Sequence, residues 1–566
     1  MGRIVVREDA DPHRDAPARR PSGGDGYQAD PDSVKPVVRS GAGEDAARLE
    51  EAPGPAWFGV RGGSRSGNHR VVQPMVPSPT EQRESPAGSL TLPRAWKWAG
   101  PVVFAVVLVG TVPSLPHRVI NWDNELKLQV ARNLVQGRGL VVTETTKDDA
   151  TYVLPGLEGR RYPPYPPLAY ALPLVTLAAE PLLGGLCEGA ATLLVLALLG
   201  WALVAWGRAA GVSLQASVTG ALLVTLGTVL WPMAALGYDV LVEALALALI
   251  LRAGTAEATG RLWVVAGLAF GSAIGIRLGA SVLGFSAAVL LLTQRPSELR
   301  ALVRRVLAFG LGILPGVGLV LWFNWLRFGS PMTFFETLAG EAGASLNMPW
   351  GSTGQLQGMA GLLVSPGKGL LWYAPPLIAV LAAAVQLARC FGPTMAALGA
   401  QLVATVLVFG RFRYWHGDWA WGPRYVSALC VAAAPLAWWL VDRATTPEWR
   451  RKWRIPAAVT ALIALQAFPV VGNPVGQHFR FTLTPLEATG RLVTRPVTRP
   501  PEPGDFRLHY YQPANSPFVS LARGFGDALR DRRRGLGVAG DLAEAAVAPL
   551  LALGLLAGLR TRAQRP

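Results

Sequence analysis

Beyond about residue 95, apolar runs long enough to cross a bilayer alternate with shorter polar segments. A transmembrane helix needs about 20 predominantly apolar residues, and a helix that is apolar on every face is typical of a membrane span. The runs that fit lie at approximately 98–115, 187–206, 213–233, 239–252, 262–275, 278–293, 306–327, 370–388, 394–410, 425–441, 455–472 and 542–559. The pattern predicts an all-α polytopic membrane protein with about twelve transmembrane helices.

One further apolar segment, 165–183, is long enough to cross but contains four prolines. Arginine placement decides whether it crosses, because short cytoplasmic loops are enriched in Arg and Lys. If the segment does not cross and the N-terminus is cytoplasmic, nearly every short arginine-rich loop falls on the inner side. We therefore expect an interfacial or re-entrant helix on the outer face, with both chain termini cytoplasmic.

The pattern divides the chain into four parts. Residues 1–94 are polar and rich in Pro and Gly, which predicts a disordered cytoplasmic tail. Residues 95–472 form the transmembrane core, with a large first outer loop at 116–186 that carries juxtamembrane helices. A further outer region follows at 473–541. Residues 542–566 contain the last span and a short basic cytoplasmic tail.

Charge and cysteine content narrow the function classes. The formal net charge is +16, but only 16% of residues are charged and most of the excess Arg flanks apolar runs. This placement indicates membrane topology and contact with anionic lipid, not nucleic acid. Three cysteines without a CxxC pair give no disulfide framework and no thiolate metal site. There is also no HxxH pair and no dense carboxylate cluster, so the sequence supports neither a metal nor another cofactor.

The first outer loop begins with NWDNELKLQVARNLVQGRGL, in which apolar residues recur every fourth position from Leu126 to Leu134. This spacing predicts a short helix that ends at the glycines. Asp123 and Glu125 stand at its start. They fit a helix cap and a favourable dipole interaction. They equally fit a general base, since an inverting sugar transfer needs a carboxylate to accept the proton of the attacking hydroxyl.

The same loop ends in GRRYPPYPPL, residues 159–168. Acidic residues, a helix, a glycine stop and an aromatic-PPL segment, in that order, resemble the first extracytoplasmic loop of the GT-C membrane glycosyltransferases. This class includes the protein O-mannosyltransferases and the bacterial lipid A aminoarabinose transferases. The resemblance implies a GT-C-like helix bundle with Asp123 as the catalytic base, Glu125 as its neighbour and Tyr165 near the sugar.

Two further segments extend the resemblance. GYDVLVEALALALIL places Asp239 and Glu243 one turn apart at the outer start of a span, where GT-C proteins often carry an acidic residue. LLVSPGKGLLWYAPP, residues 362–376, resembles a loop of bacterial GT-C sugar transferases and places Lys368 in a glycine-flanked turn. The resemblance implies substrate contacts for the two carboxylates and a donor-phosphate contact for Lys368.

The most specific segment is YWHGDWAWGPRYV, residues 414–426, which resembles an aromatic GPRY segment of the same proteins. It implies Arg424 as a donor-phosphate ligand and His416, Trp419 and Tyr425 as sugar contacts. Arginine and lysine bind phosphate through charge-assisted hydrogen bonds. For the cations the alternative is snorkelling to the interface, and for each Trp it is a place in the aromatic belt.

Two more arginines are candidate phosphate ligands. Arg277 interrupts the apolar stretch 262–293, where it is either a loop residue at a hairpin tip or a second phosphate ligand. The aminoarabinose transferases carry a Glu-Lys pair before the aromatic-PPL prolines, whereas this chain has Pro164 and Tyr165. The departure excludes assignment to that subfamily, and Arg160 or Arg161 could reach the same phosphate, although at a different spacing.

The sequence thus predicts an inverting hexosyl- or pentosyltransferase in the cytoplasmic membrane. Its donor would be a polyprenyl-phosphate sugar, and its acceptor, a lipid, glycan or protein hydroxyl, would be glycosylated on the outer face. The alternative is a transporter or flippase of a lipid-linked glycan. Transporters of this kind are commonly built from inverted repeats, and the sequence shows no such repeat.

Overall fold

The computed structural model describes residues 94–115, 122–142, 153–255, 260–293, 299–334, 347, 349–417, 420–444, 454–471, 510–531 and 537–563. All of them belong to one compact unit, Ala87–Pro566. The predictions for the tail 1–94, apart from Arg94, lie outside the described residues, as does most of the predicted outer region 473–541.

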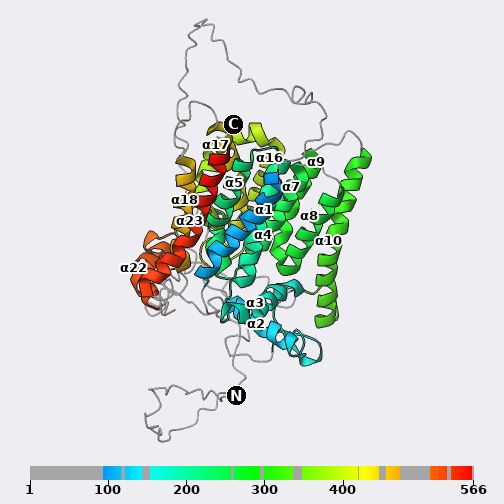
Figure 1. Cartoon of the computed structure of the whole chain (residues 1–566). Helices are drawn as coiled ribbons and strands as arrows, with labels where there is room; N and C mark the ends of the chain where they lie inside the picture. Colours follow the sequence, from blue (N-terminus) through cyan, green and yellow to red (C-terminus); the bar gives the residue numbers. More distant parts are fainter. Residues whose placement is uncertain are drawn as a thin grey trace, which may run out of the picture. The chain divides into compact units, whose positions relative to one another are not determined.

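The described chain is almost entirely helical (Figure 1). The α-helices are α1 (Arg94–Thr111), α2 (Trp122–Val135), α3 (Ala171–Leu183), α4 (Ala190–Ala209), α5 (Leu214–Leu226), α6 (Leu230–Ala235), α7 (Val240–Thr255), α8 (Gly260–Ile276), α9 (Gly284–Thr293), α10 (Leu299–Phe328), α13 (Thr353–Val364), α14 (Leu370–Tyr373), α15 (Pro376–Ala382), α16 (Ala384–Gly410), α17 (Ala433–Ala444), α18 (Arg454–Val471), α22 (Pro517–Asp531) and α23 (Gly537–Ala563).

Short 3-10 helices and one small hairpin complete the described elements. The 3-10 helices are η2 (Val112–Ser114), η4 (Leu157–Gly159), η5 (Pro167–Tyr170), η6 (Leu278–Leu283), η7 (Ser427–Ala432) and η9 (Pro513–Asn515). Strands β1 (Leu154–Pro155) and β2 (Arg161–Tyr162) pair antiparallel in the segment that leads to η5.

Four helices are long and apolar enough to cross a membrane, namely α4, α10, α16 and α18, and six shorter apolar helical stretches accompany them. Helix α4 is mostly buried among its neighbours, whereas α10 exposes large apolar side chains such as Leu311, Leu314 and Trp322. An apolar outer surface of this kind is stable in lipid and unfavourable in water. The predicted all-α membrane architecture is therefore confirmed, and the count of twelve spans stays a prediction.

Small residues allow the helices to approach closely. Helices α8 and α10 pack along much of their length. A Cβ atom on Gly267 would lie 2.1 Å from the carbonyl oxygen of Phe309, and one on Gly316 would lie 2.1 Å from that of Gly271. Such backbone contact through glycine is the usual way that helices associate in a membrane, where burial from water supplies no force between them.

Most predicted apolar runs coincide with helices, but the run 370–388 does not form one continuous helix. It contains α14, α15 and the first part of α16, which is kinked at Phe391. Pro375 and Pro376 lack the amide hydrogens that would continue α14 into α15. Helix α13 lies between the predicted spans 306–327 and 370–388, where no helix was predicted.

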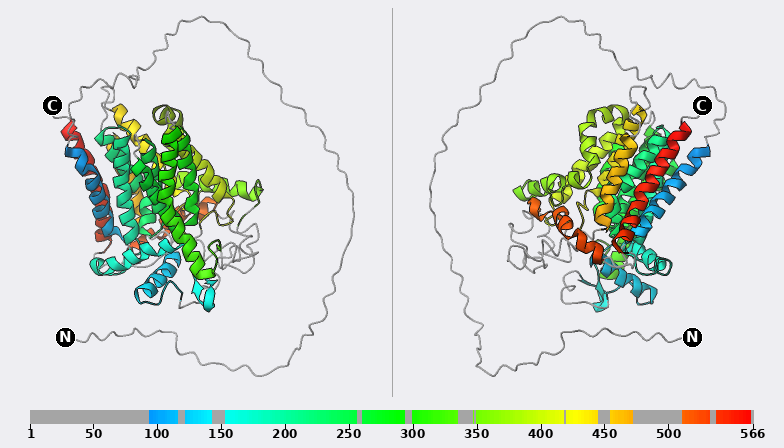
Figure 2. Two further views of the ribbon diagram at one scale, coloured as in Figure 1. Left: turned by 90° about the vertical axis from the view of Figure 1, so that its right-hand side faces the viewer. Right: turned by 60° about the vertical axis from the view of Figure 1, so that its left-hand side comes forward.

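Helices α2 and α3 lie across one end of the bundle (Figures 1 and 2). Helix α3 packs against α2 and α4 and has 13 residues. At about 1.5 Å of rise per residue, it is too short to cross a hydrocarbon core of about 30 Å. The proline-rich segment 165–183 therefore begins with η5 and continues as a short helix at this end, which we call the α2–α3 end.

Candidate active site

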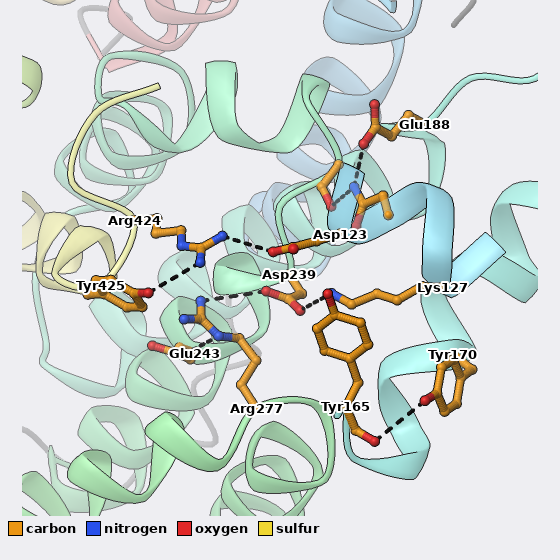
Figure 3. A network of polar contacts seen from close by, with 12 residues as sticks. Asp123, Lys127, Tyr165, Tyr170, Glu188, Asp239, Glu243, Arg277, Arg424 and Tyr425 are labelled. Carbon is orange, nitrogen blue, oxygen red and sulfur yellow. Dashed lines mark hydrogen bonds and ion pairs between the residues drawn. The ribbon is translucent and has the colours of Figure 1, made fainter. Parts of the chain in front are cut away.

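A network of charged side chains occupies the α2–α3 end of the bundle (Figure 3). Its accessible part is an ion pair between Arg424, in the turn before η7, and Asp123, in the first turn of α2. Arg424 Nη1 lies 3.0 Å from Asp123 Oδ2, and the side chains are 17% and 30% exposed. Arg424 Nη2 also donates to the Tyr425 hydroxyl at 3.2 Å. The pair therefore joins residues that lie 301 positions apart in the sequence.

The buried part of the network is built on α7. Arg277, which follows α8, lies 3.5 Å from Asp239 Oδ1 and 3.4 Å from Glu243 Oε1. Lys127 of α2 donates to the other oxygen of Asp239 at 2.8 Å. All four side chains are at most 15% exposed. Asp239 thus lies between two cations from different elements, Lys127 of α2 and Arg277 after α8.

The six charged members balance: three cations face three carboxylates. Removing one partner from a buried set of this kind leaves an uncompensated charge, which is far more costly than the net gain from forming the pair. Each charge therefore has a counter-charge within the network. An incoming anion has to compete with a carboxylate for one of the cations, and Arg424 is in the more exposed pair.

Tyr165 joins the two parts of the network. Its hydroxyl hydrogen-bonds Asp123, and Lys127 Nζ lies 4.5 Å from the centre of its ring. Arg327, at the end of α10, donates to the main-chain carbonyls of Pro163 and Tyr165 at 3.0 and 3.3 Å. This clamp holds the proline-rich segment, whose restricted backbone directs the Tyr165 side chain toward α2.

Burial by itself raises the pKa of Asp123, because a charged carboxylate loses solvation. The cations of Arg424 and Lys127, together with hydrogen bonds from Tyr165 and Arg424, outweigh burial, and the net pKa lies below its ordinary value. Burial, followed by the nearby Asp123 carboxylate, raises the pKa of Tyr165 well above its ordinary value. In this state Asp123 is ionised and Tyr165 is a neutral hydrogen-bond donor.

A second set of contacts fixes α2 in place. Asn124 Nδ2 donates to Glu188 Oε1 at 2.6 Å and to the carbonyl of Gly237 at 2.8 Å. Gly237 has a φ of +73°, and a Cβ there would lie 2.5 Å from Asn124 Nδ2. One amide thereby ties α2 to the segments that precede α4 and α7. This sets Asp123 and Asp239 relative to each other.

A small pocket of about 20 Å³ lies beside Lys127 and Asp239, with Asn124, Thr176 and Glu188 among its lining residues. It has room for about one water molecule. Among the described residues, no group of three or more His, Cys, Asp or Glu side chains could hold a metal ion.

The structure brings together seven of the predicted site residues. These are Asp123, Tyr165, Asp239, Glu243, Arg277, Arg424 and Tyr425. It leaves Glu125 exposed, since two positions along a helix turn a side chain by about 200° away from Asp123. Arg161 is exposed in β2, and Trp419 lies outside the described residues.

Lys368 and His416 form a separate buried group. Lys368 is 0% exposed and donates to the Ala420 carbonyl. The centres of the His416 and Tyr510 rings are 5.1 Å apart. Sequence reasoning also missed Lys127, Asn124, Glu188 and Arg327. Only Lys127 had a signal, because it lies four residues after Asp123 on the same helical face.

No protein-family model matches the chain, and a search of curated proteins finds no match. Among solved structures, the fold is similar to ArnT from Cupriavidus metallidurans in the apo state, at 17% identity and a TM-score of 0.45. That match covers 82% of this chain and 77% of the other. It is also similar to the same protein bound to undecaprenyl phosphate, at 18% identity and a TM-score of 0.43 over 81% and 76% of the two chains.

ArnT is an aminoarabinose transferase of the GT-C class, the class that the sequence motifs resemble. At these TM-scores neither likeness adds weight to a function, so the proposal for this chain depends on its own residues.

Proposed function

We propose that this chain is an inverting GT-C-type glycosyltransferase with a polyprenyl-phosphate sugar as its donor. The observation that carries the proposal is the Asp123–Arg424 pair at the accessible edge of a buried, charge-balanced network. A carboxylate suited to accept a proton stands beside a guanidinium suited to bind a phosphate. Aromatic and hydroxyl groups for a sugar face, Tyr165 and Tyr425, flank the pair.

The proposed reaction uses each member of the pair once. An acceptor hydroxyl forms a bond from its oxygen to the anomeric carbon of the donor sugar. The bond between that carbon and the phosphate oxygen breaks, and its electron pair leaves with polyprenyl phosphate. The acceptor's proton passes to Asp123. Arg424 stabilises the negative charge that grows on the departing phosphate.

Donor binding would change the partner of Arg424. In the described state Arg424 is bound to Asp123 and lowers the carboxylate's pKa, which makes Asp123 a weak base. A phosphate that takes over the guanidinium removes this cation from Asp123. Burial, Lys127 and Tyr165 still act on the carboxylate, and with the Arg424 contribution reduced the affinity of Asp123 for a proton rises. Base strength would thus increase at the moment when donor is present.

The buried members have a supporting role in this proposal. Arg277 is engaged with two carboxylates, although a role as a second phosphate ligand was expected from its sequence position. Asp239 and Glu243 are more buried than Asp123, and they are held by Lys127 and Arg277. We propose that these two carboxylates form the buried base of the site and that hydroxyls of the sugar contact Asp239 from the accessible side.

We further propose about twelve spans, both termini in the cytoplasm, and the α2–α3 end on the outer face of the cytoplasmic membrane. Arginine placement supports this orientation. Helix α7 begins beside Asp239 at the site and has Arg252 in its last turn. Helix α8 runs back from Arg261 in its first turn to Arg277 at the site. Arg252 and Arg261 therefore lie at the end of α7 and α8 remote from the site, as expected of arginines in a short cytoplasmic loop.

The test is transfer by the purified protein in detergent, with a panel of labelled polyprenyl-phosphate sugars and membrane extracts as acceptor source. Loss of a general base should lower the rate about 100- to 10,000-fold in Asp123→Asn. The matched control is Glu125→Gln, an exposed carboxylate on the same helix, which should keep wild-type rates.

Detergent removes any gradient and any second compartment, so turnover there distinguishes transfer from transport. A wild-type protein that consumes no donor sugar, or an Asp123→Asn variant with full activity, would contradict the proposal. The panel also identifies the sugar, and the labelled product identifies the acceptor as lipid, glycan or protein.

A further inference from the structure

Lys368 occupies a tight turn between α13 and α14. Its amide donates to Ser365 Oγ at 3.1 Å, and the amide of Gly369 donates to the Ser365 carbonyl at 2.6 Å. The turn is covered by the segment at 510–516, where the Tyr510 carbonyl accepts from Gly367 at 3.0 Å. Lys368 is completely buried as a result.

The side chain of Lys368 reaches across to a different loop. Its ammonium donates to the Ala420 carbonyl and lies 5.1 Å from the centre of the Tyr510 ring. A hydrogen bond from a cation is stronger than a neutral one, and an aromatic face favours a cation further. A four-carbon stem with a compact ammonium suits this task, because it can span a packed interior and bring a charged donor to a carbonyl of another loop.

Ala420 belongs to the loop that presents Arg424. Gly417 and Gly422 in this loop have φ values of +68° and +72°, which side-chain-bearing residues rarely adopt. A Cβ on Gly417 would lie 2.8 Å from Arg424 Cγ, so the arginine side chain runs directly over the backbone of its own loop. The position of the guanidinium therefore depends on the path of the loop around Ala420.

We infer that Lys368 is a positioning residue for Arg424: by holding the Ala420 carbonyl, it fixes the loop that aims Arg424 at Asp123. The inference rests on the proposed function only in giving Arg424 the donor phosphate. It replaces the direct phosphate contact expected for Lys368 from the sequence. A buried ammonium that is already bonded to a carbonyl acts on the donor through the loop.

Two substitutions separate the inference from a direct contact. Lys368→Met keeps the length of the side chain and removes the donor. Lys368→Gln removes the charge but keeps an N–H donor for the Ala420 carbonyl. The probe is a polyprenyl phosphate without sugar, whose dissociation constant is measured for each variant. Amide hydrogen exchange of residues 420–426 reports the loop itself and requires no ligand.

Loss of the donor to a buried carbonyl should weaken probe binding about tenfold in Lys368→Met and speed exchange in 420–426. Lys368→Gln should recover part of both. Combined with Arg424→Lys, Lys368→Met should add little further loss, because both changes act on the same contact. A direct ligand would instead give equal losses for Met and Gln, unchanged exchange and additive effects with Arg424→Lys. That result overturns the inference.

The two proposals fail in different ways. If wild-type protein does not bind polyprenyl phosphate, the proposed donor is wrong, while faster exchange in Lys368→Met would still support the positioning role. If Lys368→Met leaves exchange in 420–426 unchanged, the positioning role is wrong even when wild-type protein binds the probe. An unfolded Met variant leaves the Gln variant to decide, since Gln preserves the contact that the inference invokes.

Discussion

The two parts of the charge network contain the same kinds of side chain at similar separations, but they differ in burial. Arg424 and Asp123 are 3.0 Å apart with 17% and 30% of their side chains exposed. Arg277 and Glu243 are 3.4 Å apart with 15% and 4% exposed. Arg277 is in addition shared by two carboxylates, Asp239 and Glu243.

This difference teaches which ion pair can exchange partners. Asp123 is the most exposed member of the network, so water can replace part of its contact with Arg424, and separating this pair costs less than separating a fully buried one. Separating a buried pair leaves a charge in a medium of low polarity. The Asp123–Arg424 pair can therefore open for a ligand, while the set around Arg277 holds α7, α8 and α2 in fixed relation. One network thus contains a pair that can exchange partners, Asp123 and Arg424, and a buried set around Arg277 that holds the helices together.

The largest effect on stability should come from breaking the buried ion pairs of Arg277 with Asp239 and Glu243. Arg277→Met leaves Lys127 alone to compensate Asp239 and Glu243, and loss of one buried partner costs about 3–5 kcal/mol of unfolding free energy. Denaturant or thermal unfolding in detergent measures this. The control is Arg160→Met, because Arg160 pairs with Glu158 at 3.1 Å with both side chains more than half exposed.

The control should change stability by less than about 1 kcal/mol. Adding Glu243→Gln to Arg277→Met removes the stranded charge and should restore part of the stability. Equal destabilisation by Arg277→Met and Arg160→Met would mean that burial does not determine the contribution of an ion pair to stability. The distinction drawn here between buried and exposed pairs would then be wrong.

At the exposed edge, Arg424→Lys should alter binding more than stability. Lysine offers a point charge in place of a planar fork, and losing one charge-assisted hydrogen bond lowers affinity about tenfold to 100-fold. The dissociation constant of a polyprenyl phosphate measures the change, with the exposed Arg138→Lys as its control. A large fall in melting temperature without loss of affinity would mean that Arg424 has a structural role like that of Arg277.

Much of the fold could be predicted from the length and spacing of apolar runs, because a span must be long and apolar whatever surrounds it. The surface position of 165–183 was predicted from arginine counts and agrees with the short α3 at one end of the bundle. The break in 370–388 was not predicted, although Pro375 and Pro376 mark it. Local composition alone does not say whether a proline kinks a helix or ends it.

The site could be predicted in part. Motif order brought Asp123 and Arg424 forward as candidates, but a contact across 301 positions depends on how helices pack. The complete burial of Lys368 was not predicted. A glycine-flanked turn does not by itself show whether another segment covers it, and the cover here comes from Tyr510, far along the chain. Asn124 and Glu188 carried no local signal, since their roles exist only across elements.

A smaller effect on stability should follow from releasing α2. Asn124→Ala removes two hydrogen bonds of 2.6 and 2.8 Å, each worth about 1 kcal/mol, so unfolding free energy should fall by about 2 kcal/mol. The rate of transfer should fall as well, because Asp123 is the preceding residue. Asn124→Asp should be worse than Ala at neutral pH, since it sets a carboxylate against Glu188. An Asn124→Asp variant with wild-type stability would contradict the proposed role of the Asn124 contacts with Glu188 and Gly237.

The smallest effect is a pH dependence, and it reports the exposed pair directly. Because the folded pKa of Asp123 lies below its ordinary value of 3.8, its ionised form stabilises the fold above that pH. The stabilisation is lost as pH falls through the lowered folded pKa. The melting temperatures of wild type and Asp123→Asn should therefore differ by a constant amount from pH 7 to about 5, and converge only below about pH 4.

Removing the cation should move that convergence. In an Arg424→Met background the largest lowering influence on Asp123 is gone, while burial remains. The pKa of Asp123 should then rise, and the curves with and without Asp123→Asn should converge at a higher pH than in the wild-type background. Convergence at the same pH in both backgrounds would show that Arg424 does not control this carboxylate. The exchange of partners proposed for donor binding would then have no effect on the base.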